Sequence, residues 1–223
     1  MLPGGRGVVL LGYLALHRDR TVARDELIEA LWPQRPPPAA DASLRSLLSK
    51  LRGALGHGLI EGRSELRLVL PADAWLDFEA ADESIHRAES AVARQAWTEG
   101  WAPAHIALNV SRRMFLHGHE APWIATVRGH LEDVHMRALA CWAAIGLGIG
   151  GPELADAERA ARKLVAEAPY RESAHRLLME VLAARGNRAE ALQAYEQLRT
   201  RLRDELGTAP GESLRALHAS LLA

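Results

Sequence analysis

Only one cysteine, Cys141, occurs among the 223 residues, so no disulfide can form within the chain. Its apolar neighbours on an expected helix mark it as a small core residue. No apolar run approaches the roughly 20 residues that a membrane-spanning helix needs, and the first seven residues lack the charged-then-apolar order of a secretion signal. We therefore expect a cytoplasmic protein with no membrane partner.

The sequence also lacks the motifs of common enzyme classes. It has no phosphate-binding loop and no nucleophile elbow. The glycine-rich residues 146–151 superficially resemble a dinucleotide loop, but they follow a helix rather than a strand, which favours a flexible helix end. No second histidine pair or cysteine stands near His117 and His119 to complete a metal site. We expect no enzymatic activity, no cofactor and no metal.

Neither sign of charge dominates, since the net charge is −1. The distribution is uneven, because residues 1–70 carry +3 and the remaining residues carry −4. Hydrophobic residues make up 48% of the chain, which suffices for the core of one large domain or two small ones. A mildly basic front and a mildly acidic rear are typical of one domain that faces phosphate and another that faces protein.

From residue 78 onward the sequence reads as helices separated by glycine and proline turn signals. The stretch from Pro169 to Pro210 has the small residues and the turn glycine, Gly186, of a tetratricopeptide-type helix pair. Three of its positions have a counterpart 34 residues upstream, the period of that repeat: Ala191 with Ala157, Ala194 with Ala160, and Leu198 with Leu164. The pattern predicts a stacked, all-α array.

Five tryptophans are expected to fill gaps between helices rather than to form a binding cage. They are Trp75, Trp97, Trp101, Trp123 and Trp142.

The amino-terminal part predicts three helices and a hairpin. Apolar periodicity indicates helices over residues 8–17 and 23–32, and the prolines of residues 33–38 predict a loop. A third helix is expected from Asp41, its N-cap. Residues 59–60 and 66–70 then read as two short strands around a turn, with Arg63 at the tip and Arg67 on the outward face.

The third helix has one apolar and one polar face. At about 100° per residue, Leu44, Leu48, Leu51 and Leu55 share an arc. The other side carries the residues that we expect to contact DNA, together with the wing residue Arg63: Arg45, Ser46, Ser49, Lys50 and Arg52. Arginine forks suit guanine edges in a major groove, and hydroxyls or lysine suit phosphates.

The carboxyl-terminal part resembles the bacterial transcriptional activator domain of SARP-type regulators in its Glu-Leu-Gly at residues 205–207, the following Pro210 and one more short helix. The front resembles the response-regulator type of winged helix-turn-helix that these regulators carry. The matching positions, in order and spacing, are residues 22–24, Leu27, residues 31–32 and 37–38, Leu44, and residues 48–52 and 55–56.

This resemblance implies a mainly α protein with a winged helix-turn-helix DNA-binding domain at residues 1–74 and a tetratricopeptide-like activator domain at residues 75–223. It implies a transcriptional activator that binds double-stranded promoter DNA and recruits RNA polymerase through its helical domain. Relatives bind tandem promoter repeats side by side, so a homodimer on DNA is expected.

Two features depart from the family pattern. Relatives carry a small β-sheet before the first helix, whereas about seven residues precede Val8 here, so we expect that sheet to be largely missing. Ala23 stands where the family usually has a serine, and this removes a helix cap worth about 1 kcal/mol.

An alternative function follows from the missing sheet. A winged domain that no longer binds DNA would leave an interaction or sensor protein, whose array binds a peptide or a small anionic ligand in its concave groove. The residues expected to line a pocket for such an anionic ligand are Arg159, Arg162, Arg171 and His175.

Overall fold

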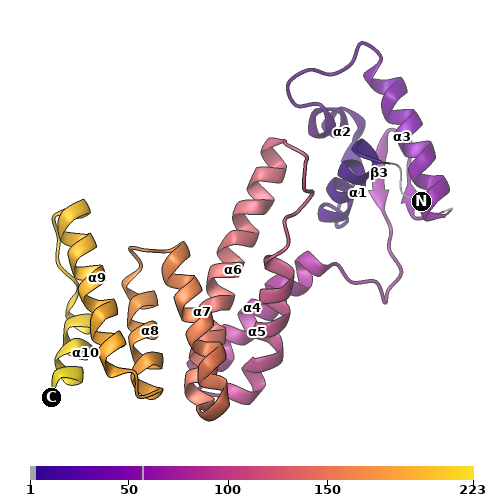
Figure 1. The fold of residues 1–223 in the computed structure, drawn as a ribbon. Helices are drawn as coiled ribbons and strands as arrows, with labels where there is room; N and C mark the ends of the chain where they lie inside the picture. Colours follow the sequence, from indigo (N-terminus) through magenta and orange to yellow (C-terminus); the bar gives the residue numbers. More distant parts are fainter. Residues whose placement is uncertain (1–3, 57) are drawn as a thin grey trace. The chain divides into compact units, whose positions relative to one another are not determined.

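The computed structural model describes residues 4–56 and 58–223 and consists mostly of helices (Figure 1). The predicted mainly α fold class is confirmed. The chain forms two compact units. The amino-terminal unit comprises Met1–Leu76 and Arg113–Leu131, and the helical array comprises Asp77–Arg112 and Glu132–Ala223.

Before residue 76, the described residues of the amino-terminal unit form three helices and three short strands. In chain order these are α1 (Arg6–Leu16), β1 (Val22–Ala23), α2 (Arg24–Leu31), α3 (Ala40–Leu55), β2 (Ile60–Glu61) and β3 (Glu65–Leu68). The strands form an antiparallel sheet in the order β1-β3-β2, in which Val22 pairs with Leu66 and Ile60 pairs with Leu68. The elements follow the order expected of a winged helix-turn-helix.

Leucines from all three helices and from β3 fill the core of this unit. The predicted apolar face of α3 is confirmed, because Leu44, Leu48 and Leu51 are buried. Leu10 and Leu14 of α1 pack in the same cluster. A stripe of leucines on one side leaves the opposite side of α3 to solvent.

The cap predicted for α3 is wrong. The helix begins at Ala40 after Ala39, which makes no side-chain capping bond. Asp41 lies inside the first turn, where a carboxylate favourably faces the positive end of the helix dipole. Ala23 is the N-cap of α2 and also makes no capping bond, as its lack of a hydroxyl requires.

Residues 113–131 pack with the amino-terminal unit, although the predicted boundary at residues 74 and 75 assigned them to the second domain. Trp123 contributes to this packing, because its indole Nε1 donates to the carbonyl of Ala30 at 3.1 Å and its ring meets Tyr13 edge-on. Ile124 is buried in the same core. The chain therefore returns to the first unit after two helices of the second.

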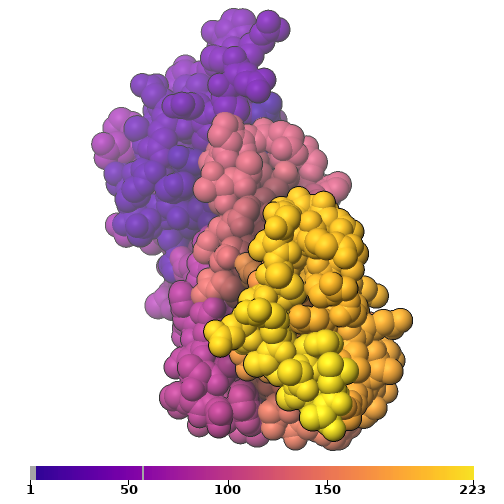
Figure 2. Space-filling view, turned by 90° about the vertical axis from the view of Figure 1, so that its left-hand side faces the viewer, coloured from indigo at the N-terminus to yellow at the C-terminus, as the bar shows by residue number. Residues whose placement is uncertain are grey.

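The helical array is built from paired helices. They are α4 (Asp77–Ala93), α5 (Trp97–Ser111), α6 (Pro122–Ile149), α7 (Leu154–Glu167), α8 (Glu172–Ala184), α9 (Arg188–Leu206) and α10 (Glu212–Leu222), with a 3-10 turn at Gly151–Glu153. The first ten residues of α6 belong to the amino-terminal unit. In Figure 2 the last helices, in orange and yellow, form one packed surface, and α10 contacts both α8 and α9.

The 34-residue repeat matches structurally equivalent helices. The repeated alanines and leucines of α7 and α9 are all buried, and all of them except Ala157 belong to one core cluster. Gly186, with a φ of +81°, turns the chain between α8 and α9 as predicted.

The glycine-rich residues 146–151 contain a helix end, as expected, because α6 ends at Ile149 and Gly150 and Gly151 follow with positive φ. Gly146 and Gly148 lie within α6 and allow close packing, since a Cβ on Gly148 would lie 2.3 Å from the ring of Trp97. The expectation for Trp75 is wrong. Trp75 is 67% exposed and fills no gap between helices, whereas the other four tryptophans pack against the cores.

Candidate nucleic-acid interface

The outward side of α3 gathers four of the predicted DNA-contact residues. Arg45, Ser46, Ser49 and Lys50 are all exposed on this one helix, opposite its buried leucines. The guanidinium of Arg45 pairs with the carboxylate of Asp41 at 3.0 Å, and its side chain is 68% exposed. This face is polar and lacks large apolar side chains, so it is suited to a hydrated, charged partner.

Arg52, also predicted to contact DNA, faces the hairpin instead. Its Nε donates to the carbonyl of Ile60 at 3.2 Å, and one terminal nitrogen donates to the carbonyl of Gly62 at 2.9 Å. The side chain is half-buried. Two of its donors are therefore committed to holding the hairpin against α3.

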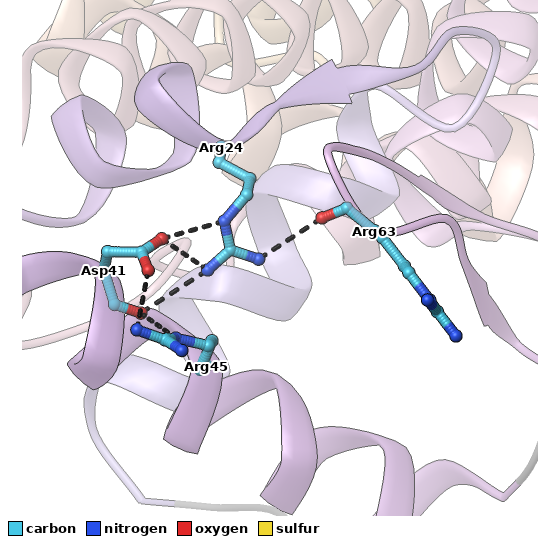
Figure 3. A network of polar contacts seen from close by, with 4 residues as sticks. All are labelled: Arg24, Asp41, Arg45 and Arg63. Carbon is cyan, nitrogen blue, oxygen red and sulfur yellow. Dashed lines mark hydrogen bonds and ion pairs between the residues drawn. The ribbon is translucent and has the colours of Figure 1, made fainter.

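The hairpin tip has a demanding backbone geometry. Gly62 has a φ of +90°, and a Cβ there would lie 1.8 Å from the carbonyl oxygen of Glu65. Only glycine fits this position. Arg63 follows on the exposed tip, where its side chain points away from the network in Figure 3, and the Nε of Arg67 donates to the carbonyl of Arg18 at 3.2 Å.

An arginine of α2 joins the first turn of α3 to the hairpin tip (Figure 3). Arg24 donates from Nε and from a terminal nitrogen to Oδ1 of Asp41, at 2.9 and 2.7 Å. Its other terminal nitrogen donates to the carbonyl of Arg63 at 3.3 Å. Hydrogen bonding from Arg24 lowers the pKa of Asp41, so the carboxylate is ionised near neutral pH.

Sequence reasoning missed this role of Arg24 and Asp41. The two residues are 17 positions apart on different helices, and no helical or strand periodicity connects them. The one available signal was a pair of opposite charges at the starts of two consecutive helices.

A second polar cluster joins α1 to α2. The hydroxyl of Tyr13 donates to Glu26 at 2.7 Å, and Arg20 donates to the same carboxylate at 2.5 Å. The bond from Arg20 lowers the pKa of Glu26 to about 2. Burial, together with the bond to Glu26, raises the pKa of Tyr13 to about 12. These contacts fix the helices that support α3.

The four residues expected to bind an anionic ligand in the array mostly have partners within the protein. Arg159 pairs with Asp156 of its own helix. Arg162 donates to Glu158 at 2.7 Å and to Glu190 at 2.5 Å.

The remaining two residues of that set differ from each other. His175 is buried, and its Nε2 donates to the carbonyl of Pro169 at 3.0 Å, while burial lowers its pKa. Arg171 is exposed and lines a groove that Arg176 also lines. The groove that Arg171 lines is therefore not lined by the other three residues of the set.

Within residues 4–56 and 58–223, no group of three or more histidine, cysteine or acidic side chains is placed to hold a metal ion. In the same part of the chain, no helix is both long and apolar enough to cross a membrane.

Comparisons with known proteins agree with this architecture. The model of the bacterial transcriptional activator domain family matches residues 76–222. Regulatory protein AfsR of Streptomyces coelicolor is 33% identical over 214 residues, which cover 96% of this chain and 21% of that protein. Transcriptional regulatory protein MoaR1 of Mycobacterium tuberculosis is 30% identical over 228 residues, which cover 96% of this chain and 70% of that protein.

A solved structure shares the fold. Mycobacterium tuberculosis EmbR, in complex with a low-affinity phosphopeptide, superposes with a TM-score of 0.79 at 27% identity, over 98% of this chain and 59% of that one. The chain spans about a fifth of AfsR and somewhat more than half of EmbR. These matches cover both units, and the chain belongs to the SARP family of bacterial transcriptional regulators, which carry the bacterial transcriptional activator domain.

Proposed function

We propose that this protein regulates transcription by binding promoter DNA through α3 and the β2–β3 hairpin. It acts as an activator whose helical array contacts RNA polymerase. Relatives named as transcriptional regulators support the regulatory role in general terms, and the same names speak against an enzyme. We place the protein in the cytoplasm, where promoter DNA is accessible.

The observation that carries the proposal is the exposed polar face of α3 above a buried leucine stripe. The major groove of B-DNA is about 12 Å wide and admits one helix. Arg45 is free to turn from Asp41 to a guanine edge, because exposed ion pairs are worth only about 0–1 kcal/mol. Ser46, Ser49 and Lys50 are suited to phosphates or base edges on either side.

The hairpin supplies the second contact. Arg63 on its tip reaches the phosphate backbone or the adjacent minor groove. Arg52 acts through the hairpin rather than on DNA, since its donors are bonded to backbone carbonyls. Two copies bind side by side on tandem sites, which doubles the number of phosphate contacts and the salt dependence of binding.

The alternative function, an array that binds an anionic peptide or small ligand while the winged unit leaves DNA unbound, has less support. The phosphopeptide in the solved complex is bound by EmbR, and that observation concerns EmbR alone. In this chain Arg159 and Arg162 are paired with carboxylates and His175 is buried. Arg171 is the member of the set best placed to meet such a ligand.

Selection from a pool of random duplexes with the full chain tests the proposal. We expect a motif to be enriched and to occur as tandem repeats. A pool that remains random after several rounds would contradict the DNA-binding function and leave the alternative.

A further inference from the structure

The hairpin tip is held by arginine side chains from two helices, α2 and α3. Arg24 of α2 donates to the carbonyl of Arg63 at 3.3 Å. Arg52 of α3 donates to the carbonyls of Ile60 and Gly62. Three carbonyls of one short hairpin thus accept bonds from guanidinium groups.

Strand pairing ends before the tip of the hairpin. The strands are two and four residues long, and the β2–β3 pair nearest the turn is Glu61 with Arg67. β3 is also the central strand of the sheet, and its first residue, Glu65, pairs with Ala23 of β1. Residues 62–64 are the part of the hairpin outside the paired strands, so their position depends on the turn itself and on side-chain contacts with neighbouring elements.

Arg24 differs from Arg52 in linking the tip to the start of α3. Its guanidinium contacts both the carboxylate and, at 3.4 Å, the backbone carbonyl of Asp41. Asp41 also binds Arg45, the residue proposed to meet a guanine edge. One planar fork therefore relates the tip residue Arg63 to the helix residue Arg45, as Figure 3 shows.

The same geometry leaves Arg24 poorly placed to contact DNA itself. Its side chain is 23% exposed, against 68% for Arg45. A guanidinium has five N–H donors in a fixed plane, and all three nitrogens of Arg24 already donate to Asp41 or Arg63. Moving it to a phosphate would break bonds on both elements.

We infer that Arg24 is a positioning residue for the DNA interface: anchored on Asp41, it fixes the hairpin tip relative to α3 so that Arg63 and Arg45 engage DNA together. This inference rests on the proposed function. It assigns Arg24 no contact with DNA.

Hydrogen exchange of the full, DNA-free chain tests the clamp separately from DNA binding. In Arg24→Gln we expect the strand amides that flank the tip, in residues 60–61 and 65–67, to exchange about tenfold faster, while those of α1 keep their rates, because local opening changes without global unfolding. Arg24→Lys keeps the charge but has no planar fork, so the same amides should also exchange faster. Unchanged exchange of these amides in both variants would overturn the clamp.

A double-mutant cycle on DNA tests the positioning role. With a labelled duplex that carries the motif enriched by selection, Arg24→Gln and Arg63→Ala should each weaken binding about tenfold, the size expected for one arginine contact. In the Arg63→Ala background, Arg24→Gln should cost less than about twofold, since there is no tip contact left to position. Two independent losses that multiply would mean that Arg24 acts on DNA directly and would overturn the inference.

Arg35→Gln is the charge-matched control, because it removes one arginine from the exposed loop after α2 in the same unit. We expect it to bind within about twofold of the unchanged protein. An Arg35→Gln loss equal to that of Arg24→Gln would reduce the effect to net charge and contradict positioning. If selection enriches no motif, the proposed function fails together with the positioning role, while the exchange result still decides whether the clamp exists.

Discussion

Replacing Arg45 by alanine tests the groove contact on which the proposed function depends. The side chain lies on the exposed face of α3 and contacts one carboxylate, that of Asp41. Its removal leaves the buried leucines of the helix in place. Substitutions at such exposed positions usually change the free energy of unfolding by less than about 0.5 kcal/mol, so the fold should be unaffected.

The expected loss of affinity follows from two opposing contributions. A bidentate contact between arginine and guanine discriminates by about 1–3 kcal/mol, or about 5- to 150-fold in affinity. Against this, Arg45 must leave Asp41 to bind DNA, but that pair is 68% and 53% exposed and costs at most about 1 kcal/mol to break. A net loss of about tenfold for the specific duplex is the expected result.

Fluorescence anisotropy with a labelled duplex measures this loss. Arg87→Ala is a matched control, because Arg87 is 66% exposed on α4 and pairs with an acidic residue four positions earlier, as Arg45 does. The control should bind like the unchanged protein. Equal affinities for Arg45→Ala and Arg87→Ala, with both proteins folded by circular dichroism, would refute the reasoning.

Three further predictions concern the supports of the two units. Leu48 lies on the buried face of α3 and is 2% exposed, so Leu48→Ala should lower the free energy of unfolding by about 2–5 kcal/mol in a urea titration, and an unchanged midpoint would contradict the packing. Gly148→Ala places a Cβ 2.3 Å from the ring of Trp97 and should destabilise the array by about 1–3 kcal/mol, seen as a lower thermal midpoint. The pKa of Glu26 is depressed from 4.5 to about 2 mainly by the bond from Arg20, so its stabilising contribution is present above about pH 4.5 and is lost as the pH falls toward 2; Glu26→Gln should lessen this acid sensitivity in thermal melts, and identical pH profiles would contradict it.

Much of the fold could be predicted from periodicity. Helix faces repeat every 3.6 residues, so the buried leucines of α3 were identified correctly. The 34-residue spacing of Ala157 and Ala191 likewise found equivalent buried positions in α7 and α9. Local patterns of this kind are set by which side of an element faces a core.

The errors occurred where a residue's partner is distant in the sequence. Trp123 packs on Tyr13 and on the backbone of Ala30, and nothing near it in the chain indicates that its segment returns to the amino-terminal unit. Trp75 was expected in a core because of its size, yet it lies exposed in the segment before α4.

In the candidate interface, too, periodicity predicted which residues are exposed but not which tertiary contacts they make. Amphipathicity placed Arg45 and Lys50 on the exposed face of α3. Helical geometry put Arg52 on the same side, but could not reveal that hairpin carbonyls take up its donors. The bond from Arg24 to Asp41 depends on how α2 and α3 pack, which is a tertiary property.

Binding of the full chain to the selected duplex and to a random duplex, by anisotropy across a salt series, tests the central claim most directly. The account predicts tight, sequence-selective binding. The logarithm of the association constant should fall linearly with the logarithm of the salt concentration, with a slope of about −0.9 for each phosphate contact. Equal affinity for the two duplexes, or no binding at low salt, would contradict promoter recognition by α3 and the hairpin.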